Sequence, residues 1–492
     1  MSIRRTAAAT ALLVVGSFLR LYDLGAMEFK SDERISLELA IAFINHHPWS
    51  SSQPWPTHGL ISSNGIGNAP LFIWIVAPLW ALTHHPVGVT AIIAAINAAS
   101  LIPLFFWARR RMDEPRALLT LAIAAVSPFA VLFSRKIWPV DLLFPAMVAL
   151  LWSIEWSREG RYWKALALAG MGVLLISQLH QSGVITAPLL LVALAVQWTI
   201  DARNDRLPRV STPSPLEIVA IACVVAANLF FWWTYLPYLL TVPAETFALR
   251  PRAGSYKPQL LFNVMSEIVP RHVLSPFFVE QHLFEADPLR ATVYYLSLAL
   301  GAPLAAYGLW RWIRAPLTLP VLGIWWWLIG VAFALGRIPS HDYYVLALMP
   351  LPIVLAAGAF DGSLSPSWSR VLLLWRWTYA VALLALTLVT GAWLAGRGGS
   401  RGDYGVTFAI QQAQARALLE HAPGQRSKVD AALGEGESQR VPLSCHQPAW
   451  EVIWIARWLD PSASIDREAV EICEGWISTG TDARYRWTVR PK

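Results

Sequence analysis

Long apolar stretches separated by short polar segments occupy the first 395 residues of the 492-residue chain. Eleven of them approach the roughly 20 residues that a helix needs to cross a bilayer. The pattern therefore predicts an all-α polytopic membrane protein with about 11 transmembrane helices. The expected spans are 6–22, 87–108, 117–133, 141–156, 163–179, 184–200, 216–240, 289–310, 316–336, 345–360 and 377–395.

One further apolar stretch, "PLFIWIVAPLWAL" at 70–82, is short and contains Pro78. Counting it as a span would place "RRRMDEPR" (109–116) outside, against the excess of Lys and Arg expected in cytoplasmic loops. We therefore expect an interfacial helix there. The N-terminus and all basic clusters then lie on the cytoplasmic side, namely "MSIRR", "RRRMDEPR", "SREGRYWK", "DARNDRLPR", "RWIR" and "SRVLLLWR".

Two long loops then face outward, a first external loop at 23–86 with juxtamembrane helices and a second at 241–288. The second carries an unusual set of basic residues for an external loop, Arg250, Arg252, Lys257, Arg271 and His272. Such a set favours an anionic ligand. A long solvated loop that tolerates the charges explains it equally well.

Residues 396–492 differ in composition from the apolar part at 1–395. "GRGGSRGDYG" is typical of a linker, "TFAIQQAQARALLEHA" has helical spacing, and "YRWTVR" has the character of a strand. We expect a small extracytoplasmic α+β domain. In that compartment Cys445 and Cys473 would form a disulfide, with two unpaired thiols as the alternative.

Composition supports the membrane assignment: 55% of the residues are hydrophobic, only 14% are charged, and 26 are Trp. Soluble domains carry about 25% charged residues. The net charge of +7 follows from basic residues that fix topology, and no basic stripe with interleaved aromatics predicts nucleic-acid binding. The sequence contains neither a phosphate-binding loop nor a dinucleotide fingerprint. Neither His pair, 46–47 or 84–85, has ligand spacing to a Cys or carboxylate, so no metal site is predicted.

An outward-facing set of polar residues carries the candidate chemistry. Asp32 and Glu33 follow the first expected span within "MEFKSDERISLELA". A carboxylate there can act as a general base, and arginines can hold a phosphate leaving group. This division of roles suits transfer from a lipid-phosphate donor. The set comprises Lys30, Asp32, Glu33, Arg34, Arg135, Lys136, Asp141, His180, Arg337, His341, Tyr343 and Tyr344.

The order of these pieces resembles the GT-C superfamily of membrane glycosyltransferases, in the branch of protein O-mannosyltransferases and the lipid A aminoarabinose transferase. The similar pieces, within residues 6–360, are "FKSDERISLELA", "GNAPLFIWIVAPLWAL", the segment from "NAASLIPLFFWARRR" to "SRKIWPVDLLFPAMVAL", "ISQLHQSGVITAPLLL" and "IPSHDYYVLALMP".

The resemblance implies that Asp32 is the base and that Glu33 orients or substitutes for it. It assigns Arg135 or Lys136, Asp141, Arg337 and His341 to the donor phosphate and sugar, and His180 and Tyr344 lie in two of the matching pieces. This chain has Asn68 and Ala69 where the family often has a second Pro or a Lys. Phosphate contacts are therefore expected from Lys30 or Arg252 instead.

The resemblance implies an inverting transfer from a polyprenyl-phosphate sugar to a lipid, glycan or protein acceptor. The reaction is expected at the outer face of a bacterial inner membrane, among membrane lipids. No cofactor is required, and a divalent cation is an alternative to arginine at the phosphate. The alternatives are a transporter or flippase of a lipid-linked amphiphile and a catalytically inactive envelope subunit.

Overall fold

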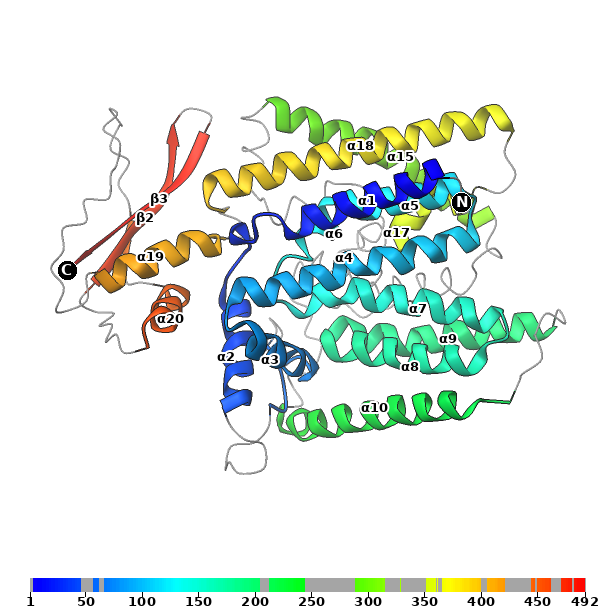
Figure 1. Ribbon diagram of the computed structural model, residues 1–492, viewed down its shortest axis with the longest axis horizontal. Helices are drawn as coiled ribbons and strands as arrows, with labels where there is room; N and C mark the ends of the chain where they lie inside the picture. The colour runs from blue at the N-terminus through cyan, green and yellow to red at the C-terminus, as the bar shows by residue number, and fades with distance from the viewer. Residues whose placement is uncertain are drawn as a thin grey trace. The chain divides into compact units, whose positions relative to one another are not determined.

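The structure is a computed structural model, and it describes residues 3–45, 56–61, 66–203, 212–243, 288–314, 328, 351–359, 361, 365–399, 405–420, 444–446, 449–461, 470–479 and 482–491. The described chain is mostly helical (Figure 1). It divides into two compact units, and three of the boundaries between them fall inside helices. The first unit comprises 1–22, 36–274 and 293–387, and the second comprises 23–35, 275–292 and 388–492.

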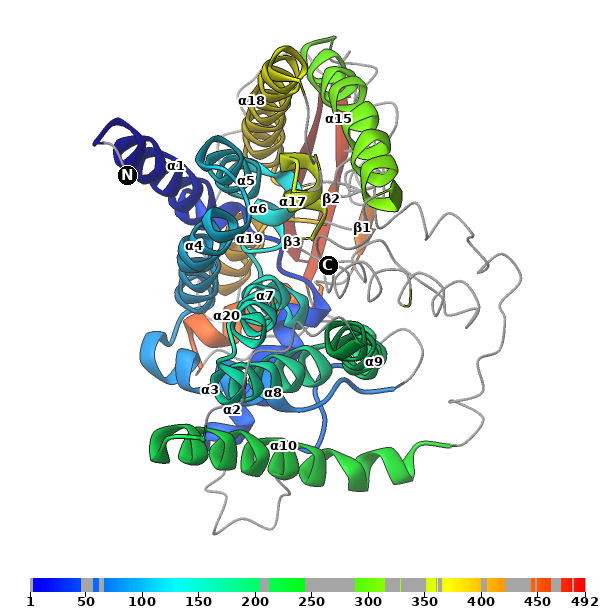
Figure 2. The same cartoon turned by 90° about the vertical axis from the view of Figure 1, so that its right-hand side faces the viewer.

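The first unit is a bundle of helices in which chain neighbours pack on one another. The helix α1 contacts α4 and α5, α7 contacts α8, and α8 contacts α9 and α10. Figure 2 shows α4, α5, α7 and α9 nearly end-on. The helices are α1 (Ile3–Leu21), α3 (Leu71–Thr83), α4 (Pro86–Arg111), α5 (Glu114–Val126), α6 (Pro128–Leu132), α7 (Leu143–Arg158), α8 (Tyr162–Leu179), α9 (Gln181–Arg203), α10 (Pro215–Thr241) and α17 (Leu351–Ala357), with the 3-10 turn η2 (Pro139–Leu142) and most of α2 (Ser31–Asn45), α15 (Pro288–Arg314) and α18 (Pro366–Arg397).

Six helices in the described part of the chain are long and apolar enough to cross a membrane, which makes this a multi-pass membrane protein. They are Pro86–Arg111, Pro139–Arg158, Tyr162–Leu179, Pro215–Thr241, Pro288–Gly308 and Pro366–Gly396. Each coincides with one of the eleven expected spans. The stretch expected to be interfacial is the 13-residue helix α3.

The other expected spans differ in outcome. The expected spans 6–22 and 184–200 correspond to α1, which ends at Leu21, and to α9; both are helices that do not meet the same criteria of length and hydropathy. The expected continuous helix at 117–133 is wrong, because α5 ends at Val126 and α6 begins at Pro128. A residue that precedes proline is disfavoured in helical geometry, which explains the break. Apart from 328 and 351–359, the spans expected at 316–336 and 345–360 lie outside the described residues.

Polar caps fix where the apolar helices begin. The side chain of His85 accepts a backbone N–H at 3.0 Å at the start of α4, and that of Asp113 does the same at 3.0 Å for α5. Ser214 and Glu217 form a reciprocal capping box at the start of α10. Each cap satisfies a donor that the first helical turn leaves unpaired, at a point where the sequence changes from polar to apolar.

Close packing in the bundle depends on a small residue in α1. A side chain at Gly16 would place a Cβ atom 2.8 Å from Leu101 Cδ1 and 3.0 Å from Ala125 Cβ. The neighbouring Arg20 is fully buried and donates hydrogen bonds of 2.9 Å to the carbonyls of Gly16, Ala124 and Ala125. A cation at the C-terminal end of α5 also complements the dipole of that helix.

Ion pairs join the basic clusters that the sequence assigned to one side of the membrane. Arg5 pairs with Glu114, Arg110 pairs with Glu159, and Arg111 pairs with Glu155. The N-terminus and the loops that precede α5 and α8 therefore meet at the same end of the bundle. This agrees with the expected grouping of these loops, while the side that they face stays a prediction.

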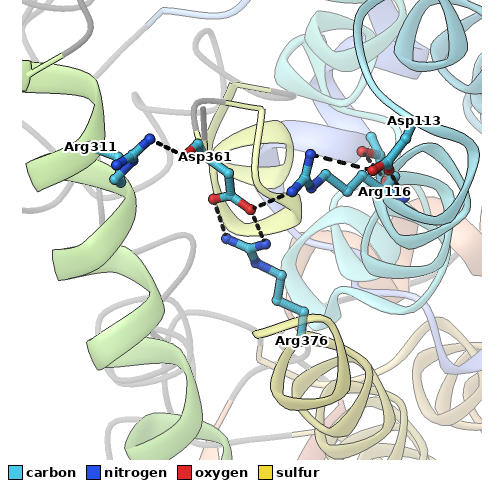
Figure 3. Close-up of polar contacts among 6 residues, drawn as sticks. Asp113, Arg116, Arg311, Asp361 and Arg376 are labelled. Carbon is cyan, nitrogen blue, oxygen red and sulfur yellow. Dashed lines mark hydrogen bonds and ion pairs between the residues drawn. The ribbon is translucent and has the colours of Figure 1, made fainter. Parts of the chain in front are cut away.

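Asp361 connects α5 at this polar end of the bundle to two more helices, α15 and α18 (Figure 3). Its carboxylate accepts hydrogen bonds of 2.6 and 2.7 Å from Arg376 of α18 and lies 3.3 Å from Arg116 of α5. Arg311 of α15 donates to the main-chain carbonyl of Asp361. Asp361 and Arg376 are almost completely buried, so this is an internal charged junction.

The second unit combines helices with a small antiparallel sheet of order β1-β2-β3. Its elements are η1 (Leu24–Ala26), α19 (Phe408–Glu420), β1 (Ser444–His446), α20 (Trp450–Leu459), β2 (Val470–Thr479) and β3 (Asp482–Pro491). The helix α19 packs on α20 and on β3. Residues 396–492 thus contain both helices and strands, and their extracytoplasmic position stays a prediction.

Candidate active site

Residues 27–35, here called the acidic segment, contain the predicted catalytic pair and belong to the second unit. The side chains of Met27 and Phe29 are completely buried. The helix α2 begins at Ser31, so Asp32 and Glu33 lie in its first turn, where the helix dipole favours negative charge. The buried anchors and the helix start together hold both carboxylates in a defined place.

Glu33 has a structural role in the acidic segment. One of its carboxyl oxygens accepts the backbone N–H of Lys30 at 2.8 Å, as a glutamate in the first helical turn does in a capping box. The side chain is nearly inaccessible to solvent. Burial, followed by the nearby Asp32 charge, raises the pKa of Glu33 from its ordinary 4.5 to about 7. Glu33 is therefore well suited to orient the helix start.

Two cations of the acidic segment are paired within the unit. Lys30 Nζ lies 2.5 Å from a carboxyl oxygen of Glu28, which is buried. Arg34 Nε lies 3.3 Å from Glu451 at the start of α20. Asp32 is half-buried, so of the predicted catalytic pair it is the carboxylate with the greater access to solvent and to a substrate.

The raised pKa of Glu33 predicts a pH-dependent stability. Glu33 holds its proton more tightly in the folded chain than in the unfolded chain. The stabilisation of the fold by this proton is therefore complete below pH 4.5 and is lost as the pH rises through about 7. Between those values the free energy of unfolding of the wild type should fall by about 3 kcal/mol relative to Glu33→Gln. Thermal unfolding in detergent across this range measures the difference. Parallel pH curves for the two proteins would contradict the assignment.

A second group of predicted site residues lies in the first unit, on the turn between α6 and η2. Lys136 is buried, and its ammonium lies 5.3 Å from the ring centres of Phe133 and of Trp138. Asp141 is also buried, and its main-chain carbonyl accepts a hydrogen bond of 2.8 Å from Asn97 of α4. Lys136 and Asp141 are thus two buried charged residues of one short segment, with Lys136 before η2 and Asp141 within it.

Arg135, from the same turn, is half-buried and donates a hydrogen bond of 2.7 Å to the carbonyl of Tyr22, next to the end of α1. The predicted residues of this turn therefore have different environments. The ammonium of Lys136 faces aromatic rings, while Arg135 ties the turn to the first helix.

The end of α8 lies against η2, and it carries His180 and Gln178. The helices α7 and α8 pack on each other, and a Cβ atom at Gly172 of α8 would lie 2.6 Å from Leu150 Cδ2 of α7. Gln178 is completely buried, and neither of its amide atoms has a hydrogen-bond partner among the described residues. A buried amide left in this state costs about 1–3 kcal/mol, so a ligand or water is expected there.

The remaining predicted donor-site residues, Arg252, Arg337, His341 and Tyr344, lie outside the described residues, as does most of the loop 241–288. In the described part of the chain no three His, Cys, Asp or Glu side chains are grouped as metal ligands.

Sequence reasoning did not single out Glu28, Gln178 or Gln411. Glu28 stands within the quoted acidic stretch, so its charge was visible while its burial was not. Gln178 is part of "ISQLHQSG" but is chemically ordinary. Gln411 contacts the acidic segment from a distance of hundreds of residues along the chain, which no local pattern reveals.

The register of the sheet bears on the predicted disulfide, because Cys445 of β1 lies directly opposite Cys473 of β2. Facing residues of antiparallel strands have Cα atoms about 4.5–5.5 Å apart, within the range that a disulfide bridges. We expect non-reducing mass spectrometry of the purified protein to find one peptide pair linked through Cys445 and Cys473, with Cys223 free. Alkylation of all three thiols without prior reduction would contradict the bridge.

Comparison with known proteins shows the fold. No family model matches the sequence, and no curated protein matches it. The crystal structure of ArnT from Cupriavidus metallidurans bound to undecaprenyl phosphate is similar, with a TM-score of 0.51 and 15% identity over 92% of this chain and 84% of that one. Its apo state gives a TM-score of 0.51 and 15% identity over 86% and 81%.

The archaeal oligosaccharyltransferase AglB from Archaeoglobus fulgidus, in complex with an inhibitory peptide and a dolichol-phosphate, has a lower TM-score of 0.46, with 14% identity over 93% of this chain and 63% of that one. The two ArnT structures define the fold: this chain has the fold seen in ArnT. The resemblance noted from the sequence is confirmed at the level of the fold.

Proposed function

We propose that the protein transfers a sugar from a polyprenyl-phosphate donor to an acceptor at the outer face of the bacterial inner membrane. The observation that carries the proposal is the ArnT-like fold over 92% of the chain, combined with a carboxylate pair in the first turn of α2. The similar ArnT structure holds undecaprenyl phosphate, and this supports a polyprenyl phosphate as the lipid that carries the donor sugar.

In the proposed reaction, Asp32 accepts the proton of an acceptor hydroxyl or amine as that group attacks the anomeric carbon of the sugar. The new bond to the acceptor forms while the bond between the anomeric carbon and the phosphate oxygen breaks. Polyprenyl phosphate leaves with that electron pair, and the configuration at the anomeric carbon inverts. Glu33 orients Asp32 by fixing the start of α2.

The negative charge on the departing phosphate requires cations, which hydrogen-bond and neutralise it. Lys136 and Arg135 are the candidates among the described residues of the first unit, and Arg252 and Arg337 are further candidates by sequence. Asp141, His180, His341 and Tyr344 supply polar contacts to the sugar, and Lys30 is a further candidate for the phosphate. The acceptor is a lipid, glycan or protein.

The test uses the purified protein in detergent with polyprenyl-phosphate donors that carry a radiolabelled hexose, pentose or aminosugar, and a crude envelope extract as acceptor. Transfer of label from the lipid fraction to the extract supports the proposal, and the productive donor names the sugar. Matched reactions with heat-inactivated protein correct for hydrolysis. If all donors stay intact while proteoliposomes move them across the bilayer, the protein is a transporter and the proposal fails.

A further inference from the structure

The acidic segment is held by the C-terminal part of the chain through its own backbone. Glu28 forms an antiparallel bridge with Thr407. The N–H of Phe408 donates to the carbonyl of Met27 at 3.0 Å. The side-chain amide of Gln411, one turn into α19, donates to the carbonyl of Phe29 at 2.8 Å. Three consecutive residues of the acidic segment therefore have partners around the start of α19.

Burial makes the hydrogen bond from Gln411 to the Phe29 carbonyl hard to replace by water. Gln411 is 7% exposed and Phe29 is completely buried, so water has little access to replace the donor. A buried carbonyl that loses its donor costs about 1–3 kcal/mol. The amide oxygen of Gln411 has no partner in the described part of the chain, so this single bond is what the side chain contributes.

Aromatic packing fixes the same contact from the other side. The Phe29 ring centre lies 5.2 Å from that of Phe408 in α19 and 5.7 Å from that of Trp454 in α20. Trp458 stacks on Trp454 at 6.4 Å. Because α19 and α20 both contact the same phenyl ring, a shift of either helix would move the backbone that leads into α2.

A close approach at Gly405 adds a third constraint. Its φ of +67° lies in the left-handed region that favours glycine, and a Cβ atom there would lie 2.8 Å from Cε of Lys30. The chain before α19 therefore passes directly against the side chain of Lys30. On the other flank of Asp32, Arg34 is paired with Glu451 of α20. Residues 27–34 are thus contacted along their length.

We propose that α19 sets the position of the Asp32 carboxylate, with Gln411 as the positioning residue that acts through the Phe29 carbonyl. This inference rests on the proposed function, because it assigns the C-terminal unit a role in that reaction. The restraint at Phe29 lies three residues before Asp32, immediately ahead of the first turn of α2. Losing it frees the helix start to shift while the donor-binding residues of the first unit keep their own contacts.

The test compares Gln411→Met with Gln412→Met, the adjacent and half-buried position of the same helix. The first variant removes the donor at similar volume, and the second makes the same chemical change beside it. We expect Gln411→Met to lower kcat by about 10–100-fold with an unchanged KM for the donor, since misplacement of about 1 Å is enough for such a loss. Gln412→Met should retain both constants.

The split between kcat and KM separates positioning from general damage. A purely structural role would lower the active fraction and the thermal midpoint, and KM and kcat per folded molecule would stay at wild-type values; that outcome overturns the proposal. If Gln411→Met does not fold, Gln411→Asn replaces it, because its shorter side chain keeps the amide but withdraws the donor. Wild-type protein that transfers no donor would instead overturn the proposed function, and this inference with it.

Discussion

Replacing Asp32 with Asn should lower kcat for sugar transfer by about 10²–10⁴-fold, the usual contribution of a general base. Asn keeps the size and polarity of the half-buried side chain but cannot accept the acceptor's proton. The variant should therefore fold normally and still bind the donor. Label transfer from a radiolabelled polyprenyl-phosphate sugar measures kcat, and donor titration measures KM.

Glu33→Gln is the matched control, because it makes the same exchange at the neighbouring residue. Its side-chain oxygen can still accept the N–H of Lys30, so the start of α2 stays intact and activity should remain within about tenfold of the wild type. The reverse pattern, with Asp32→Asn active and Glu33→Gln inactive, would assign the base to Glu33. Wild-type activity in both variants would sink carboxylate catalysis at this site.

Replacing Asp361 with Asn should lower the free energy of unfolding by about 3–5 kcal/mol, the cost of removing one partner from a buried ion pair. Arg376, which is 2% exposed, would keep its charge inside the bundle without the carboxylate that now binds it through two hydrogen bonds. Arg116 would lose the same partner. The thermal midpoint in detergent should fall accordingly.

Asp113→Asn provides the comparison for that loss. Asp113 also lies near Arg116, at 3.4 Å, but its side chain is 53% exposed, where an ion pair is worth at most about 1 kcal/mol. Asn is as good a helix N-cap as Asp, so α5 keeps its start. If the two variants unfold at the same temperature, the junction around Asp361 does not carry the stability assigned to it.

Hydropathy predicted the helical membrane part because lipid imposes a composition and a length on each spanning segment. It did not resolve the break between α5 and α6, although Pro128 was visible and a proline begins a new helix more readily than it continues one. Hydropathy also ended one expected span at 360, one residue before Asp361. The carboxylate of Asp361 joins α5 and α18. Apolar length carries no information about such tertiary ion pairs.

The acidic pair could be identified from the sequence because two carboxylates after the first span are rare in so apolar a chain. Their surroundings could not. The Arg34–Glu451 pair joins residues 417 positions apart, and the Phe29 contacts with α19 and α20 are equally distant. Pairings of this kind depend on the folded path of the whole chain, which neither charge spacing nor periodicity encodes locally.

The bond between Gln411 and Phe29 spans 382 residues, and this separation has a consequence for biosynthesis. The acidic segment leaves the ribosome early, whereas α19 and α20 are made near the end of translation, at about 5–20 residues per second. The acidic segment consequently has no contacts with α19 and α20 while most of the membrane helices are being synthesised. Only a chain translated through α20 can complete the surroundings of Asp32, so nascent and prematurely terminated chains lack them.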